Sequence, residues 1–146
     1  MAGLYDSDVL EWSEHQSRLL HDLASGRPAN ESPDWTNIIE EVESVGRSQL
    51  SAVKSLLVQA LLHDLRCAAW PDSREVQHWR AEARGFRDDA AEALTPSMRQ
   101  RIDVPNLYRR AVGRLPETMD GQRQLPLPEP CPATLDQMLG MPLVAG

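Results

Sequence analysis

Apolar side chains recur at helical intervals of three and four residues along most of the chain, and no stretch alternates as a half-buried β-strand does. The first predicted helix begins near Asp6 or Ser7, either of which can cap free backbone amides. It ends before the segment 26–33, which holds one glycine and two prolines. The pattern continues through a long helix over about 35–68 and through further helices beyond it. We therefore predict an all-α fold, a helical bundle of four to six helices with one long central helix.

The long helix carries a heptad seam, in which the positions alternate in steps of four and three. These positions are Trp35, Ile39, Val42, Gly46, Gln49, Val53, Leu56, Ala60, His63 and Cys67. At 1.5 Å per residue the helix would extend roughly 50 Å, which exceeds the width of a compact domain of this size. It therefore either bends, with Gly46 as the natural place, or protrudes and is covered by a second subunit. Because glycine inside a helix costs about 1 kcal/mol relative to alanine, Gly46 also suggests a place where another helix backbone approaches closely.

A hairpin between the long helix and the third helix is predicted around the turn "AWPDSRE". Asp72, with Glu75 three residues later, resembles a capping box and predicts the start of the third helix. In the antiparallel register that follows, Asp64 falls opposite Arg80, and we predict an ion pair between them. The four tryptophans are expected to act as packing or interface residues; they are Trp12, Trp35, Trp70 and Trp79.

The sequence pattern of the last third of the chain predicts short elements. Shorter helices lie on either side of a break at Pro105, and residues 116–131 form a proline-rich connector that should run extended over the surface. A last short helix precedes residues 141–146, which we expect to form a disordered tail. The whole chain is predicted to be a single all-α domain, 1–146, with a core over about 4–140.

The composition fits a cytoplasmic domain. A chain of 146 residues with 41% hydrophobic residues can bury a real core. No run approaches the roughly 18 uncharged apolar residues of a membrane span, and the first residues have neither the basic start nor the apolar core of a signal peptide. Cys67 and Cys131 are too few for a disulfide framework and are expected to be ordinary thiols. We expect no membrane contact.

Arginine makes the middle of this acidic chain locally basic. The net charge is −7, yet residues 66–114 hold ten arginines against seven acidic side chains. Arginine suits carboxylate and phosphate equally, and the acidic character of the chain favours pairing within the chain or between subunits over an anionic ligand. The candidate ligand-binding or anion-binding arginines are Arg80, Arg84, Arg87, Arg109 and Arg110. A nucleic-acid surface would add Arg74, Arg99, Arg101 and Arg114.

Glu11, His15, Glu40 and Glu43 are candidate metal ligands. The first two are spaced by four and the last two by three, so each pair can share a helix face, and a site between the helices would use both pairs. Dinuclear metal bundles, however, use Glu-x-x-His pairs, which the long helix lacks. The favoured interpretation is that these carboxylates stabilise the helix dipole, form ion pairs or are simply exposed to solvent, since none of these roles needs a metal ion.

His63 sits on the apolar seam with Cys67 one turn later. Imidazole and thiolate both suit zinc, but a third ligand is lacking. The favoured interpretation of His63 is a core histidine that is hydrogen-bonded to a partner on a facing helix.

Four blocks in chain order resemble a known family. They are "YDSDVLEWSEHQSRLL", "DWTNIIEEVESVGRSQLSAVKSLL" followed by "LLHDL", "HWRAEARGFRDD", and "CPATLDQML". Together they resemble DUF29, a bacterial family of uncharacterised function, over roughly residues 4–140. The resemblance implies an all-α, bundle-like fold and a cytosolic bacterial protein, and it brings no known activity, cofactor or catalytic residue. Two departures are the short proline-rich segment before "CPATL" and "RCAAWP", where the family has a more basic lysine-tryptophan ending.

These patterns favour a non-enzymatic protein-interaction or regulatory module, either a homodimer formed through the long helix or a partner of another protein. The sequence lacks a phosphate-binding glycine loop, a GxSxG elbow and an HExxH motif, and we predict neither a catalytic residue nor a cofactor. Two alternatives stay open. One is a nucleic-acid-binding or toxin–antitoxin-like component that uses the arginine-rich region 74–114, and the other is a metal-dependent bundle enzyme.

Overall fold

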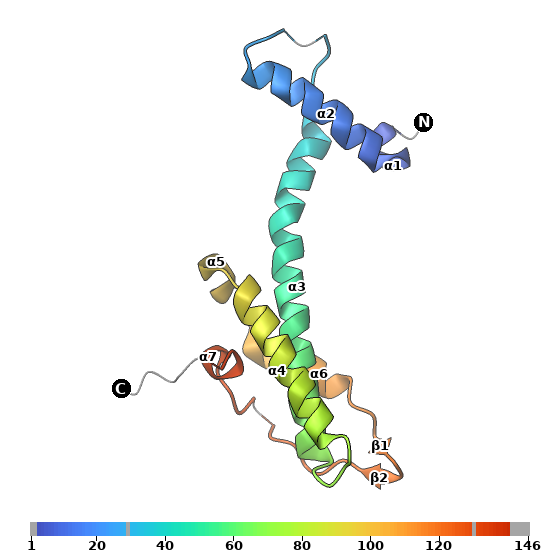
Figure 1. Cartoon of the computed structure of the whole chain (residues 1–146), viewed down its shortest axis with the longest axis vertical. Coiled ribbons are helices and arrows are strands. Elements are labelled where there is room, and N and C mark those ends of the chain that lie inside the picture. Colours follow the sequence, from blue (N-terminus) through green and yellow to red (C-terminus); the bar gives the residue numbers. More distant parts are fainter. Residues whose placement is uncertain (1–2, 29, 130, 141–146) are drawn as a thin grey trace, which may run out of the picture. The chain divides into compact units, whose positions relative to one another are not determined.

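Helices form almost all of the regular structure in the computed structural model, which describes residues 3–28, 30–129 and 131–140 (Figure 1). Four helices span ten residues or more: α2 (Val9–Ala24), α3 (Trp35–Ala69), α4 (Val76–Ala93) and α6 (Val104–Gly113). The remaining elements are short: α1 (Leu4–Ser7), α5 (Pro96–Arg99), α7 (Leu135–Met138), β1 (Thr118–Met119) and β2 (Gln122–Arg123). The predicted all-α fold with one long central helix is confirmed.

The chain divides into two compact units, and the single all-α domain that the sequence predicted, 1–146, stays a prediction. Unit 1 is Met1–Ser48 and unit 2 is Gln49–Gly146, so that α3 contributes residues to both. The heptad seam of α3 runs through this boundary without interruption. The predicted disordered tail, residues 141–146, lies outside the described residues.

The start of α2 differs from the prediction. Asp8, rather than Asp6 or Ser7, is the capping residue, and its carboxylate accepts a hydrogen bond of 3.0 Å from the backbone N–H of Glu11. The preceding residues form the separate turn α1. Asp8 has the non-helical backbone that a capping residue needs, with φ −152° and ψ 87°.

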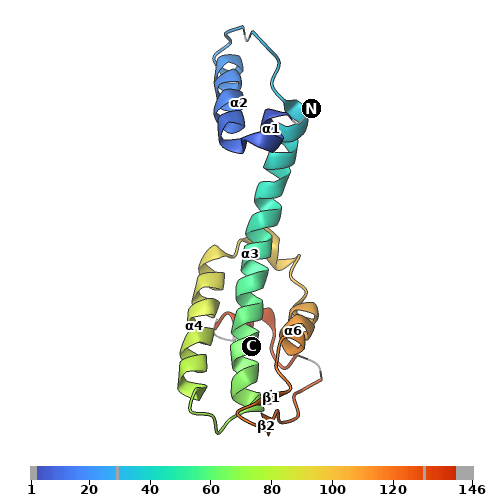
Figure 2. The same ribbon diagram turned by 90° about the vertical axis from the view of Figure 1, so that its right-hand side faces the viewer.

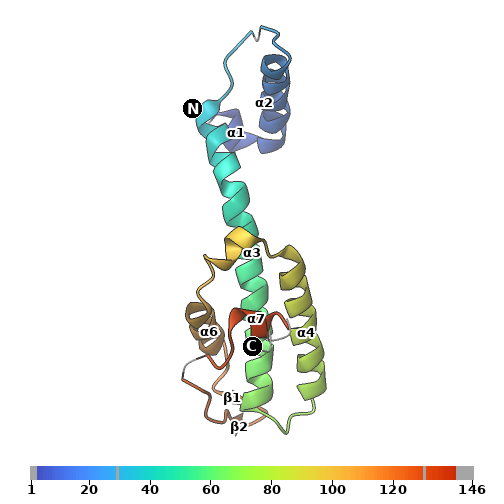
Figure 3. The ribbon, with the colours of Figure 1, turned by 90° about the vertical axis from the view of Figure 1, so that its left-hand side faces the viewer.

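In unit 2, α4 and α6 lie on opposite sides of α3, and α7 lies over α3 between them (Figures 2 and 3). Because neighbours pack on several sides of this part of α3, its buried positions go well beyond a single stripe. The main core consists of Val53, Leu57, Val58, Leu61, Leu62, Leu65, Ala90, Leu107, Tyr108, Ala111, Met138 and Leu139. A second cluster, at the turn between α3 and α4, consists of Ala69, Trp70, Val76 and Trp79.

The hairpin between α3 and α4 has a different register from the predicted one. Asp64 pairs with Arg87, whose Nη1 lies 2.8 Å from Asp64 Oδ2, and the predicted pair with Arg80 is wrong. One cause is that α4 begins at Val76, three residues later than a cap at Asp72 would place it. This later start moves the residue opposite Asp64 further along α4. A second cause is that long side chains on a helix lean toward its N-terminus, so Arg87 reaches back.

A hairpin that periodicity did not predict begins the proline-rich connector. Strands β1 and β2 pair antiparallel across a two-residue turn, Asp120 and Gly121, whose φ angles are 51° and 77°. An Asp-Gly pair with both φ angles positive is typical of the tight hairpin turn. With only two residues in each strand, the hairpin is too short for an alternating pattern to reveal it.

Three hydrogen bonds fasten the connector to the helices of unit 2. They run from Trp70 Nε1 to the Gln122 carbonyl (3.0 Å), from the Leu125 N–H to the Ala69 carbonyl (3.0 Å), and from the Tyr108 hydroxyl to the Pro128 carbonyl (2.6 Å). Leu127 also packs against the core. The connector is therefore a surface segment that is held in place by side chains and carbonyls of α3 and α6 and the turn after α3.

The last helix is fixed by its cap and by its apolar face. In α7, the Thr134 hydroxyl accepts from the Gln137 N–H (3.3 Å) while the Gln137 side chain accepts from the Thr134 N–H (2.8 Å), which completes a capping box. Met138 and Leu139 are buried in the core, and Asp136 pairs with Arg99 at 2.7 Å. Met138 and Leu139 therefore tie α7 to the main core of unit 2.

Candidate functional site

Asp34, the residue before α3, links α2 to the first turn of α3 in unit 1. Its carboxylate accepts hydrogen bonds from the indole N–H of Trp12 (3.0 Å) and the side-chain amide of Asn37 (2.7 Å). The backbone N–H of Asp34 donates to Gln16 Oε1 (2.6 Å), and Gln16 lies one turn after Trp12 on the buried face of α2. The bonds from Asn37 and then Trp12 lower the pKa of Asp34 below its ordinary value of 3.8. We call these four residues the Asp34 clasp.

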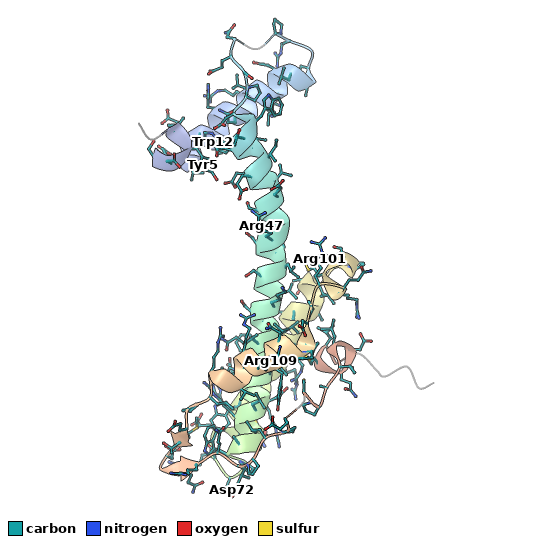
Figure 4. The ribbon with its side chains drawn as sticks, turned by 180° about the vertical axis from the view of Figure 1, so that it is seen from behind. Tyr5, Trp12, Arg47, Asp72, Arg101 and Arg109 are labelled. Atoms are coloured by element: carbon teal, nitrogen blue, oxygen red, sulfur yellow. The ribbon has the colours of Figure 1, made fainter. Side chains whose placement is uncertain are left out.

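Tyr5 extends this contact to α1. Its hydroxyl donates to Glu41 Oε1 (2.6 Å), and its ring meets that of Trp12 edge-on, with centroids 4.8 Å apart (Figure 4). The hydrogen bond to the carboxylate raises the pKa of Tyr5, so the hydroxyl remains a donor. This cluster was not predicted, although Gln16, a polar residue between the apolar positions Trp12 and Leu19 of α2, was a usable signal. Its role is to hold three helices together.

The first part of the α3 seam is uncovered in unit 1. The exposed fractions are 49% for Trp35, 53% for Ile39, 70% for Val42 and 62% for Val45. Spacings of four and three place these side chains on one side of the helix, and we call them the contact face. Gly46 follows directly, and a Cβ added there would meet nothing within 4 Å. The helix approach predicted at Gly46 is therefore not made within the described residues, and its role in a subunit contact stays a prediction.

Unit 1 buries little apolar surface. Its buried large apolar side chains, within the described ranges, are Trp12 and Leu19. Its exposed large apolar side chains are Leu4, Val9, Leu10, Leu23, Trp35, Ile39, Val42 and Val45, against Val112 and Leu125 in unit 2. In the part of the chain that is described, no helix is both long enough and apolar enough to cross a bilayer. Unit 1 therefore depends on the Asp34 clasp more than on a core, and its apolar side chains gather on the outside.

The structure does not bring the four candidate metal ligands together. His15 Nε2 lies 2.7 Å from a carboxylate oxygen of Glu31. Glu40 and Glu43 both face Arg47, at 2.8 Å and 3.9 Å. Across residues 3–28, 30–129 and 131–140, no group of three or more His, Cys, Asp or Glu side chains is placed to hold a metal ion. Within the described ranges, the site predicted from Glu11 and these residues is not assembled, and His15, Glu40 and Glu43 face other side chains instead.

His63 is buried, as predicted, but its hydrogen-bond partner is on its own helix. Nδ1 lies 2.7 Å from the carbonyl of Gln59, one turn earlier in α3, and the ring packs against Phe86 of α4 with centroids 5.3 Å apart. The facing helix thus offers an aromatic ring and not a polar partner. Cys67 donates to the Val76 carbonyl (3.7 Å), and burial, with a smaller contribution from Asp64, raises the pKa of its thiol. A protonated thiol is a poor zinc ligand.

The candidate anion-binding arginines are divided between two sides of unit 2. Arg80, Arg84 and Arg87 belong to α4, whereas Arg109 and Arg110 belong to α6, on the other side of α3 (Figures 2 and 4). A nucleic-acid backbone requires a continuous basic face. These five arginines therefore lie on helices at opposite sides of α3 (Figure 2), and the nucleic-acid alternative, which also uses Arg74, Arg99, Arg101 and Arg114, stays a prediction.

The sequence model of a family described as "Domain of unknown function DUF29" matches residues 4–142, and the chain belongs to this family. No curated protein matches the chain. Among solved structures, an alpha-helical protein of unknown function from Rhodospirillum rubrum is similar, with 24% sequence identity and a TM-score of 0.61. The similarity covers 95% of this chain and 90% of that one. At this identity the likeness shows the helical fold, and both relationships lead to proteins whose function is uncharacterised.

Proposed function

We propose that this DUF29 protein is a non-enzymatic interaction module that forms a homodimer through the contact face of unit 1. One observation carries the proposal: among its described residues, this unit of 48 positions buries two large apolar side chains and exposes eight. Units near this size are marginal by themselves and commonly rely on oligomerisation for stability. A partner that covers Trp35, Ile39, Val42 and Val45 would supply the missing core.

A second copy is the partner that best fits a permanent need. If unit 1 is stable only when a partner packs on the contact face, that partner must be present whenever the chain folds. A second copy of the chain is always present under those conditions. A two-fold contact uses the same patch on both subunits. The contact face suits such pairing because it is a single helix side, and Gly46 next to it leaves the backbone open to close approach.

Charge gives this dimer a distinctive salt dependence. Residues 1–48 hold ten acidic and three basic side chains, a net charge of −7. Two such units repel each other, so added salt should strengthen the homodimer by screening this repulsion. Binding to a basic protein would instead weaken with salt.

The proposal is tested by light scattering on the wild type and on Val42→Lys, over a range of protein and salt concentrations. The wild type should have twice the chain mass of 16.4 kDa. Lysine at position 42 places a charge in the apolar contact and also lowers the negative charge of each unit 1. The change in net charge by itself would strengthen the dimer, so dissociation of this variant would show that position 42 lies in the contact. We expect the dimer dissociation constant to rise by at least about a hundredfold, since an unpaired charge in an apolar contact costs several kcal/mol.

The matched control is Val112→Lys, the same change at an exposed valine of unit 2. It should leave the mass and its salt dependence unchanged. A wild type that stays monomeric at every concentration, or a dimer that Val42→Lys leaves intact, contradicts the proposal. A dimer that weakens with salt would place the contact on another surface. The cytosolic location predicted from the sequence stays a prediction.

A further inference from the structure

A pocket of about 200 Å³ lies in unit 2 between α3, α4, α6 and α7. Its walls include Leu61 and Leu65 of α3 and Met138 of α7, which also belong to the main core. Tyr108 and Pro128 close another side, and the hydroxyl of Tyr108 donates to the carbonyl of Pro128 (2.6 Å). The pocket is therefore built from core side chains and from one fastened segment of the connector.

The Tyr108 hydroxyl keeps the proton that this fastening bond needs. Burial first, and then the nearby Cys131 and Glu129, raise the pKa of Tyr108 above its ordinary value of 10.0. The hydroxyl is therefore neutral at physiological pH and donates to the Pro128 carbonyl. This wall of the pocket keeps its shape over the pH range in which binding would be measured.

The size of the pocket limits what can enter. A cavity of about 150 Å³ with apolar walls already holds one benzene-sized molecule. The pocket between these four helices therefore has room for a single ring or one branched alkyl chain, but not for a nucleotide or a folded peptide segment.

The ion pair between Asp64 and Arg87 lies at the edge of this apolar space, and both residues line it. The bond of 2.8 Å uses one of the five N–H donors of the guanidinium and one of the two carboxylate oxygens. Both side chains remain partly exposed, so a polar group can reach the unused atoms from solvent. Because the pair is neutral as a unit, it favours neither a lone cation nor a lone anion. A head group that carries both charges fits it better.

We propose that this pocket binds a small molecule whose apolar side chain is attached to an ammonium and a carboxylate, the chemistry of a free apolar amino acid. The side chain enters between Leu61, Leu65 and Met138. The carboxylate meets the free donors of Arg87, and the ammonium meets the free oxygen of Asp64. The site uses unit 2 alone, so it is independent of the contact face and of dimer formation.

The probes for a test are L-leucine and its two half-molecules, 4-methylpentanoic acid, which lacks the ammonium, and isopentylamine, which lacks the carboxylate, titrated into the full chain. The readout is the NMR signal of the Met138 methyl group, which is buried against the pocket. L-leucine should cause a saturable shift and should bind at least about tenfold more tightly than either half-molecule, because each half leaves one member of the ion pair unused.

Two substitutions on α3 separate pocket binding from a general effect. Ala68→Leu fills the pocket from its lining and should abolish the saturable shift, whereas Ala52→Leu, at an exposed position of the same helix that does not line the pocket, should preserve it. Asp64→Asn removes the negative member of the pair and should reverse the preference, so that 4-methylpentanoic acid binds at least as well as L-leucine.

The proposal is overturned if none of the three probes gives a saturable shift in the folded wild type up to millimolar concentration. It is equally overturned if Ala68→Leu responds as the wild type does. Equal binding of L-leucine and a half-molecule by the wild type would refute the two-charge head, and with it the assigned ligand class. Light scattering of the same samples shows whether the dimer is present, so a failure here is distinguishable from a failure of the proposed dimer.

Discussion

The two units use the same helix in opposite ways. In unit 2, α4, α6 and α7 pack around α3 (Figures 2 and 3), and the seam residues Val53 and Ala60 are buried, with exposed fractions of 0% and 1%. In unit 1 the same seam continues, but Trp35, Ile39 and Val42 are exposed. A heptad seam thus identifies the side of a helix that is suited to packing. It does not identify what covers that side, or whether the chain itself supplies the cover.

The two units also differ in the forces that hold them together. Unit 2 has a main apolar core and a second apolar cluster, and its polar bonds fasten surface segments to residues of both. Unit 1 relies on a carboxylate, Asp34, which receives donors from Trp12 and Asn37. Core substitutions should therefore dominate in unit 2, and acid should act selectively on unit 1.

The largest expected effect is the loss of a core side chain in unit 2. Leu57→Ala should lower the free energy of unfolding of unit 2 by about 3 kcal/mol, because a cavity replaces a fully buried leucine. Ile39→Ala, on the contact face, should change unit 1 by no more than about 0.5 kcal/mol. Both are measured by urea titration with NMR signals from each unit, in the Val42→Lys background so that association does not contribute. Comparable losses of unfolding free energy in Leu57→Ala and Ile39→Ala would contradict the finding that Leu57 is buried and Ile39 is exposed.

A smaller effect is expected from acid on unit 1. Because hydrogen bonds lower the folded-state pKa of Asp34 below 3.8, its contribution to stability is fully present above pH 3.8. That contribution is lost as the pH falls through the lower folded-state pKa. The indole N–H signal of Trp12, followed by NMR against pH, should report this loss.

Asp34→Asn provides the control for the acid effect, since its amide does not titrate. This variant should be less stable than the wild type at neutral pH, and its Trp12 signal should lack the wild-type transition below pH 3.8. An identical acid transition in both proteins would mean that other carboxylates govern the acid response of unit 1.

The smallest expected effect concerns the register of unit 2. A double-mutant cycle with alanine at Asp64 and Arg87 should give a coupling free energy of about 0.2–1 kcal/mol, the range of partly exposed ion pairs. The corresponding cycle at Asp64 and Arg80 should give a value near zero. A larger coupling to Arg80 than to Arg87 would favour the register that was predicted from the sequence.

The helices of this protein were largely predictable because their signals are local. The seam of α3, the last short helix and the stop before residues 26–33 depend on residues a few positions apart, and the structure contains all three features. The predictions were wrong where several neighbouring residues could give the same local signal. Asp6, Ser7 and Asp8 all can cap a helix, and Asp8 does so because the residues before it form a turn of their own.

The candidate site residues were less predictable because their contacts join distant segments. The bond from Trp12 to Asp34 spans 22 positions, and the bond from Trp70 to Gln122 spans 52. The pair of Asp64 with Arg87 depends on where α4 starts, so a difference of a few residues at the turn selected a different arginine. No pattern of three and four residues contains this information.

The sequence by itself determined the helical class, the long seam and the family to which the chain belongs, because periodicity and motif spacing are properties of neighbouring residues. Only the tertiary structure decided which part of the seam is covered, which carboxylates are paired and where a pocket lies. Those outcomes depend on how distant segments share a limited amount of apolar surface. In unit 2, α4, α6 and α7 cover the apolar core positions of α3, whereas unit 1 has one long helix, α2, whose buried face is occupied by the Asp34 clasp.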